Sequence, residues 1–190
     1  ISGNDAVSGA GIAINDQALL TINSSNNECW NQQKCNSISD NKTDFITGEG
    51  GAIYANNSQL IMSYTHIYDN RAKLGVVLFA ENNASISLKN SLVFNNGNMG
   101  GSGWDDGYAY YLHQSSFAMN HVSSIENKVK LTTFRQVVGQ HTITKSIFKE
   151  STTGYLGNIS GGTGVRDCLL MDNDAGFSGH TNSYITNNPG

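Results

Sequence analysis

An internal repeat constrains the fold of this 190-residue chain more than any other feature. The segments "GGAIYANNSQLIMSYTHIYDN" (50–70) and "GYAYYLHQSSFAMNHVSSIEN" (107–127) align over 21 positions without a gap. Each copy has a Gly-led apolar stretch, a polar turn, an alternating stretch and a short tail. The tail ends at Asn41, Asn70, Asn96, Asn127, Ser151, Asn173 and Asn188. Copies this short cannot bury their own apolar residues, so they must stack on their neighbours.

Within each copy, apolar and polar residues alternate with a period of two, which predicts short strands with one buried face. Well-separated copies lie about 22 to 31 residues apart, a spacing typical of solenoids. No copy carries a helical apolar stripe of useful length, which argues against a helical solenoid. Superposing the copies gives four columns of equivalent residues: Leu60, Ile86 and Phe117; Met62, Leu88, Met119, Ile143 and Val165; Thr65, Ser91, Val122, Ser146, Cys168 and Ser183; and Ile67, Val93, Ser124, Phe148, Leu170 and Ile185.

The Asn that closes most tails predicts a hydrogen-bonded stack. Asn tolerates left-handed backbone, and its side-chain amide can bond the Asn above and the Asn below. A general preference of Asn for turns would explain one such residue, but not six at one offset. We therefore expect Asn70, Asn96 and Asn127 to stack inward on successive rungs of a parallel coil. Seven rungs at about 4.8 Å each would make a rod about 35 Å tall.

Two short motifs carry a resemblance to a known class of repeat. "GGAIY" at 50–54 and "FNN" at 94–96 resemble the repeats of chlamydial polymorphic outer-membrane proteins, autotransporter passengers and surface proteins of some microbial eukaryotes. The pattern covers residues 9–188, although only one copy of each short motif is intact. The resemblance implies an all-β fold, a right-handed parallel β-helix (solenoid) of about seven rungs. Those relatives are mostly adhesins or surface structural proteins, whereas other β-helices are pectin-active enzymes or phage tailspikes.

We expect residues 1–190 to form a single β-helix domain that is a segment of a longer chain or assembly. Composition fits many tight turns, with 21 Gly, 24 Asn and a single Pro, Pro189. Only 14% of residues are charged and the net charge is −4, which argues against nucleic acid as a partner. No run of 18 apolar residues occurs, so no transmembrane segment is expected.

The cysteines lie in two different contexts. Cys29 and Cys35 flank the polar stretch "CWNQQKC", whose five intervening residues can close a loop through a disulfide. Two free thiols remain the alternative, and a metal site is less expected because the segment has no His. Cys168 falls in an inward column and is expected to be a buried free thiol. A disulfide would imply an oxidising compartment.

Five Asn-x-Ser/Thr sequons fit a secreted eukaryotic chain, although a sequence rich in Asn and Ser produces several by chance. They begin at Asn23, Asn41, Asn56, Asn83 and Asn158. Each is a candidate glycosylation site.

Three insertions interrupt the repeat, at residues 23–35, 42–49 and 97–106, and insertions in a solenoid form loops that carry function. The third contains the adjacent carboxylates Asp105 and Asp106 beside Trp104. With Trp30 from the first insertion, these residues are the predicted ligand-binding set. The alternative is that "GNMGGSGWDDG" is a solvated Gly-rich turn.

Catalysis is the alternative function. "WDDG" and "SGHT" resemble fragments of the Asp-Asp and Gly-His motifs of pectin-cleaving hydrolases, which would assign catalysis to Asp105, Asp106 and His180. The two pieces lie about three rungs, or roughly 14 Å, apart along the axis, too far to act on one glycosidic bond unless a loop folds over. For a lyase, Asp172 and Asp174 are weak calcium candidates and Arg166 a weak base. No other cofactor is expected.

The five histidines show no metal-ligand spacing and are expected on the surface: His66, His113, His121, His141 and His180. The sequence thus predicts an extracellular or cell-surface β-helix, structural or adhesive, that presents loops to glycans or surface proteins. A polysaccharide-degrading enzyme (lyase or glycoside hydrolase) and a repeat module of an extracellular fibre remain alternatives. In the fibre, further β-helix segments would stack on the uncapped ends.

Overall fold

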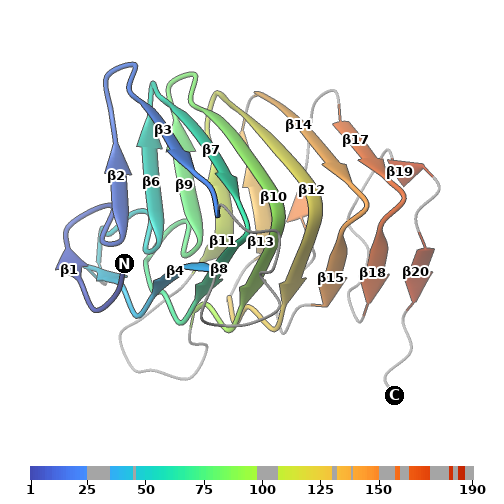
Figure 1. Cartoon of the computed structure of the whole chain (residues 1–190), viewed down its shortest axis with the longest axis horizontal. Helices are drawn as coiled ribbons and strands as arrows, with labels where there is room; N and C mark the ends of the chain where they lie inside the picture. The colour runs from blue at the N-terminus through green and yellow to red at the C-terminus, as the bar shows by residue number, and fades with distance from the viewer. Residues whose placement is uncertain are drawn as a thin grey trace.

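The computed structural model (Figure 1) describes residues 1–24, 35–44, 46–97, 107–129, 132–137, 139–149, 157–158, 163–171, 180–181 and 184–186. Within these ranges the chain is all-β, with twenty strands and no helix. The strands form sheets of twelve, six and two strands. Every strand pair among the described residues is parallel, as a stacked repeat requires.

The six-stranded sheet contains β2 (Ile12–Ile14), β6 (Ile53–Asn56), β9 (Leu78–Glu81), β11 (Tyr108–Leu112), β13 (Thr132–Gln136) and β16 (Gly157–Asn158). The main path of the twelve-stranded sheet, called the long sheet below, contains β3 (Leu19–Ile22), β7 (Gln59–Ser63), β10 (Ser85–Phe94), β12 (Ser115–Ile125), β14 (Gly139–Thr144), β17 (Thr163–Arg166) and β19 (His180–Thr181). Branching from that path are β4 (Asn36–Ser39), β8 (Thr65–Tyr68), β15 (Ile147–Lys149), β18 (Leu169–Met171) and β20 (Tyr184–Thr186). The pair β1 (Asp5–Ala6) and β5 (Lys42–Thr43) completes the set.

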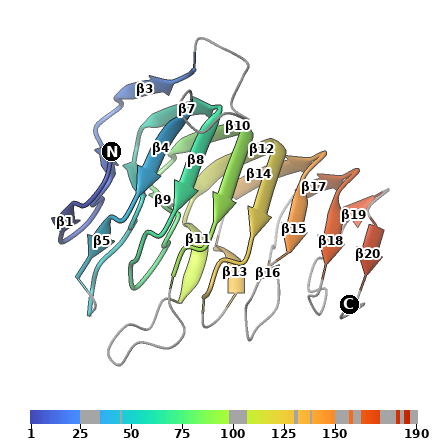
Figure 2. The same ribbon diagram turned by 60° about the horizontal axis from the view of Figure 1, so that its bottom comes forward.

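Each strand pairs with the equivalent strand of the next copy, and Figure 2 shows one such row running from β4 and β8 to β20. The predicted columns are confirmed at every described pair. Leu88 pairs with Met62 on one side and Met119 on the other, and Ile143 continues the same column. Val93 likewise lies between Ile67 and Ser124. Ser183 lies outside the described residues.

The Gly that opens a copy is required by the backbone. Gly50 has φ +67°, a conformation that L side chains rarely adopt. A Cβ added there would lie 2.4 Å from the carbonyl oxygen of Ile53. Gly75, which opens the next copy, has φ +62° and would meet Leu78 in the same way. The chain can therefore enter the six-stranded sheet only through glycine at these two positions.

A second left-handed residue bends the chain in the middle of the long sheet. It occurs once in each copy, at Tyr64, Asn90, His121, Lys145 and Asp167, with φ between 48° and 54°. Asn90 and His121 interrupt β10 and β12 without ending them. A single left-handed residue redirects the strand, so the same column of residues remains inward on both sides of the bend.

The predicted Asn stack is confirmed and is longer than expected at one end. Asn70 donates from its backbone N and its Nδ2 to Oδ1 of Asn96, at 3.1 and 2.9 Å, and Asn96 repeats both bonds to Asn127 at 3.2 and 2.8 Å. Asn41 makes the same pair of bonds to Asn70. Asn4, in the first copy, donates to Asn41 at 3.2 and 2.8 Å, although the sequence around it does not match the tail. The residues that close the last three tails, Ser151, Asn173 and Asn188, lie outside the described residues.

The interior is filled by the inward columns, with 29 of the described residues in one buried cluster. Aromatic rings stack within it, as Tyr110 lies 4.6 Å from Phe134 between ring centroids. The expectation that all histidines lie on the surface is wrong for His141, which is 3% exposed. Register places it beside Phe117, in the column that Leu60 and Ile86 begin, so the alternation of the strand turns its side chain inward.

The corner between the Asn stack and the next Gly accepts different lengths of chain. Residue pairs Lys42–Arg71 and Glu49–Leu74 are bridged in parallel on two successive copies. Six residues separate the bridges in the first copy and two in the second. The predicted insertion 42–49 therefore begins and ends in paired backbone. Among the described residues, no helix is long and apolar enough to cross a membrane.

Candidate functional site

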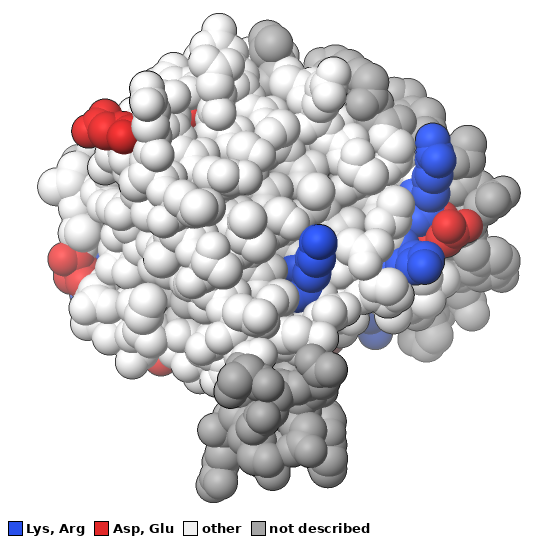
Figure 3. Space-filling view, turned by 45° about the horizontal axis from the view of Figure 1, so that its top comes forward, with Lys and Arg blue, Asp and Glu red and all other residues white. Residues whose placement is uncertain are grey.

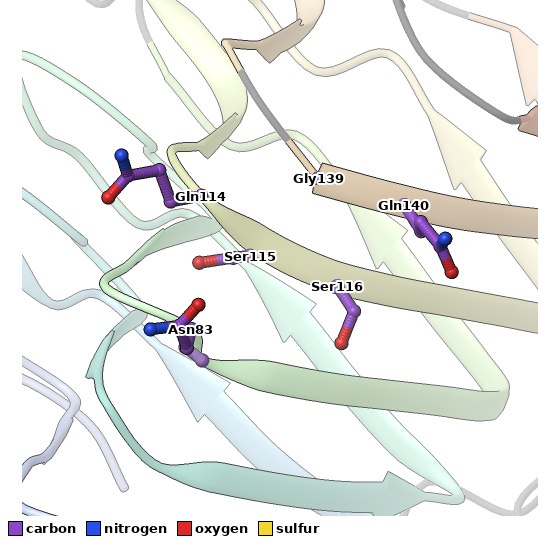
Figure 4. Close-up of a pocket in the computed structure, with 7 residues that line it drawn as sticks. Asn83, Gln114, Ser115, Ser116, Gly139 and Gln140 are labelled. Carbon is purple, nitrogen blue, oxygen red and sulfur yellow. The ribbon is translucent and has the colours of Figure 1, made fainter.

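A polar groove of about 600 Å³ lies where the turns after the six-stranded sheet lead into the long sheet (Figure 4). Its volume is within the range of about 300 to 1,000 Å³ typical of small-molecule sites. It is lined by Asn83, Ala84, Gln114, Ser115, Ser116, Gly139 and Gln140. These residues come from three successive copies of the repeat.

The groove follows from the turn conformations. Asn83 and Gln114 have φ of 65° and 51°, and the backbone N of Asn83 donates to the carbonyl oxygen of Gln114 at 2.7 Å. This bond fixes neighbouring turns against each other, and both amide side chains are exposed at the rim. In the next copy Gly139 pairs with Ser115 at the start of β14, where Gly139 and Gln140 bound the groove.

The strand residues complete the lining. Ser116 and Gln140 are paired in register on β12 and β14, and both are exposed. Ser115 is buried, and its hydroxyl donates to the carbonyl oxygen of His113 at 2.9 Å, which holds the turn. Apart from the methyl group of Ala84, every side chain that lines the groove is an uncharged amide or hydroxyl. Such groups can donate and accept hydrogen bonds from a hydroxyl-rich ligand, but none of them titrates near neutral pH.

The groove opens onto a face with little charge. The outward residues of β7, β10, β12 and β14 form this surface, called the outer face: Gln59, Ile61, Ser63, Ser85, Ser87, Lys89, Ser116, Ala118, Asn120, Gln140, Thr142 and Thr144. Lys89 is the single charged member of this set. Figure 3 shows a broad uncharged area with an isolated basic side chain near its middle and other charged groups toward the edges. Long-range attraction of a charged ligand is therefore not built into this surface.

The sequence-predicted ligand and catalytic residues are not brought to the groove by anything that the structure describes. Trp30, Trp104, Asp105 and Asp106 lie outside the described residues, as do the calcium candidates Asp172 and Asp174. Strand β19 pairs His180 with Val165, a member of an inward column, but the side chain of His180 is not described. Among the described residues, no group of three or more His, Cys, Asp or Glu could hold a metal ion.

The described aromatic residues of the six-stranded sheet are largely structural. Tyr110 is buried in the core and is not available as a contact residue. On the outer side of the six-stranded sheet, Phe79 stacks between Tyr54 and Tyr111, with centroids 5.7 and 5.0 Å apart and planes within 11°. Because each ring covers the face of the next, this stack offers ring edges rather than open faces for sugar stacking.

A polar cluster ends that aromatic stack. The hydroxyl of Tyr54 donates to Glu81 Oε1 at 2.6 Å, and Nδ2 of Asn56 donates to the same oxygen at 3.2 Å. Burial, with a smaller contribution from the negative charge of Glu81, raises the pKa of Glu49 above its usual value. Because Oε1 of Glu81 already accepts both of these hydrogen bonds, we interpret the cluster as a structural network.

The cysteines behave as their positions predict wherever the structure describes them. Cys168 is free and buried, which confirms that expectation, and burial raises the pKa of its thiol. Its Sγ donates to the carbonyl oxygen of Arg166 at 3.2 Å. Cys35 is disulfide-bonded. Its expected partner Cys29 lies outside the described residues, so the pairing remains a prediction.

The described sequon Asn residues differ in exposure and in hydrogen bonding. The assignment of Asn41 as a glycosylation candidate is wrong, because this residue is fully buried and its Nδ2 donates to Asn70 at 2.9 Å. Asn56 is half-buried and engaged with Glu81, and Asn23 accepts a hydrogen bond from Ser63 at 2.8 Å. Asn83 is exposed at the rim of the groove. The side chain of Asn158 is not described.

Sequence reasoning missed the groove, although one signal was present. In the turn that precedes the long sheet, "ENNAS" (81–85) and "HQSS" (113–116) place an amide at equivalent positions, Asn83 and Gln114. In comparisons with known proteins, no family model, no curated protein and no solved structure matches this chain.

Proposed function

We propose that this chain is a right-handed parallel β-helix of about seven rungs that acts as an extracellular or cell-surface adhesive protein, binding neutral glycans through the groove. The parallel register and the Asn stack support the β-helix. Parallel strands of one sheet joined by crossovers are right-handed in about 98% of cases, which supports the handedness. The bonded state of Cys35 supports an oxidising compartment.

The observation that carries the glycan proposal is the chemistry of the groove. Its exposed side chains are three amides and one hydroxyl, from Asn83, Gln114, Gln140 and Ser116. Planar amides can donate and accept at once, which suits the adjacent hydroxyls of a sugar ring. The absence of a carboxylate among the lining residues supports binding rather than cleavage, since glycosidases use paired carboxyl groups. The enzyme and fibre alternatives rest on residues and ends outside this groove.

The test is a binding assay with the unglycosylated chain. Neutral and acidic polysaccharides would be titrated by calorimetry or biolayer interferometry at low and high salt. We expect a neutral polysaccharide to bind, with affinity nearly independent of salt because no charged pair forms. A Gln114→Ala, Gln140→Ala double variant should weaken binding at least about tenfold, given about 1 kcal/mol for each lost hydrogen bond.

Gln59→Ala is the matched control, because Gln59 occupies the same outward column as Gln140 but does not line the groove. Its affinity should stay near that of the wild type. Equal affinity of the double variant and the wild type would refute the groove as the binding site. Binding restricted to acidic polymers and abolished by salt would refute the neutral-glycan proposal.

A further inference from the structure

Asn83 combines a sequon with a place in the groove. The sequence Asn83-Ala84-Ser85 is an acceptor for N-glycosylation, and sequons are modified on exposed surface turns. Asn83 has φ 65° in the turn between β9 and β10, and both Asn83 and Ser85 are exposed. Within the described residues, neither side chain has a hydrogen-bond partner, so the amide nitrogen and the hydroxyl are both accessible.

The other described sequons are less suited to modification for specific reasons. Asn41 is enclosed in the Asn stack. In Asn56, Nδ2 donates to the hydroxyl of Tyr54 at 3.3 Å and to Glu81 at 3.2 Å, while Oδ1 accepts from Asn82. Attaching a sugar to that nitrogen would break at least one of these bonds. Asn23 is exposed, but its Oδ1 is held by the hydroxyl of Ser63.

We propose that Asn83 is an N-glycosylation site, and that its first sugar residues occupy the polar groove and thereby regulate access to it. The side chain of Asn83 belongs to the lining, so a sugar linked to Nδ2 starts at the rim of the site. The other polar lining groups, from Gln114, Ser116 and Gln140, are the neutral donors and acceptors that a sugar ring requires. A tethered sugar also has a high effective concentration, which favours it over a free ligand.

This inference rests on the proposed extracellular function, because N-glycosylation takes place in the secretory pathway. It predicts two forms of one protein. The form without a sugar at Asn83 has an open groove, and the form with a sugar has a filled one. The partner of the groove in the second form is then the protein's own glycan.

The first measurement is site occupancy. The full chain would be secreted from a eukaryotic host, and glycopeptides covering the sequons would be quantified by mass spectrometry. We expect Asn83 to be occupied in most molecules and Asn41 in none. Folded, secreted protein that is modified at Asn23 or Asn56 but not at Asn83 would overturn the proposal.

The second measurement tests whether the sugar fills the groove, and it needs no external ligand. A Gln140→Cys variant would be secreted with and without the additional change Ser85→Ala, which removes the sequon and keeps Asn83. We expect the thiol at position 140 to react at least about tenfold more slowly in the glycosylated form. A Thr142→Cys variant, two residues along the same strand and outside the lining, should react equally in both forms.

Equal reactivity of position 140 in the two forms would overturn the filling of the groove even if Asn83 is modified. Cys168 does not interfere, because it is buried in the folded chain. The glycan-binding proposal is tested separately with the unglycosylated chain. Failure of that assay leaves the occupancy and reactivity results unchanged, so the two proposals can fail independently.

Discussion

Replacing His141 by Leu should make the protein more stable, and increasingly so as the pH falls. His141 is 3% exposed, and neither ring nitrogen has a hydrogen-bond partner among the residues that the structure describes. Its column neighbours on the preceding copies are Phe117, Ile86 and Leu60. Leu is an apolar side chain already found in that column, so the substitution removes two unpaired polar atoms without requiring a new contact. An unsatisfied buried polar group costs about 1 to 3 kcal/mol, which sets the expected gain at pH 7.

The pH dependence follows from the pKa of the same side chain. Burial lowers the pKa of His141 from 6.5 to about 4. Between these values the unfolded chain binds a proton that the folded chain does not, so acidification favours unfolding. Above pH 6.5 both states are neutral and the effect vanishes. Each unit of pKa difference corresponds to about 1.4 kcal/mol, so the loss grows as the pH falls and reaches on the order of 3 kcal/mol below pH 4.

The assay is urea unfolding followed by circular dichroism at pH 7 and pH 4. The variant isolates His141 from the carboxyl groups, because those titrate equally in both proteins. We expect the stability difference between His141→Leu and the wild type to widen by about 2 to 3 kcal/mol from pH 7 to pH 4. A His121→Asn control, at an exposed position, should show no such widening. A difference that is constant with pH would refute the account of a neutral buried imidazole.

Two further perturbations test the interior. Asn96→Ala should destabilise the fold by about 3 to 5 kcal/mol, because five hydrogen bonds of its side chain are lost. The control Asn120→Ala, on the outer face, should cost less than about 1 kcal/mol. Equal losses of stability in thermal unfolding would contradict a stabilising role of the stack. Thiol labelling without reductant should tag Cys168 alone and only after unfolding, and labelling of Cys29 or Cys35 under those conditions would show that their pairing is wrong.

Much of this architecture could be predicted because a stacked repeat places the same residue in the same surroundings many times. Leu88 is inward for the reason that Met62 and Met119 are, so each copy supports the assignment of the others. The Asn stack was predictable on the same grounds. Asn4 was missed because it joins the stack from "ISGN", which lacks the alternating tail of the other copies.

The exceptions to the repeat were harder to predict. His141 follows Phe117 in its column, whereas the sequence predicts a surface position for it, as for the other histidines. The period of the strand decides the direction of the side chain, even when the interior provides no partner for it. The groove was missed because its lining comes from three successive copies, and the residue pattern of a single copy does not show which side chains lie together between copies. The loops that the sequence favoured as sites lie outside the described residues.

The corner between Lys42 and Glu49 offers a position for engineering. Both ends of this segment are fixed by parallel bridges to Arg71 and Leu74, so its length is independent of the register on either side. A foreign peptide inserted there would be anchored at both ends, and its closure would cost only about 0.6 kcal/mol for each doubling of length. Equivalent corners recur on successive copies, separated by the distance between neighbouring strands of the sheet. The scaffold could therefore display several grafted sequences in a row, at a separation set by the backbone.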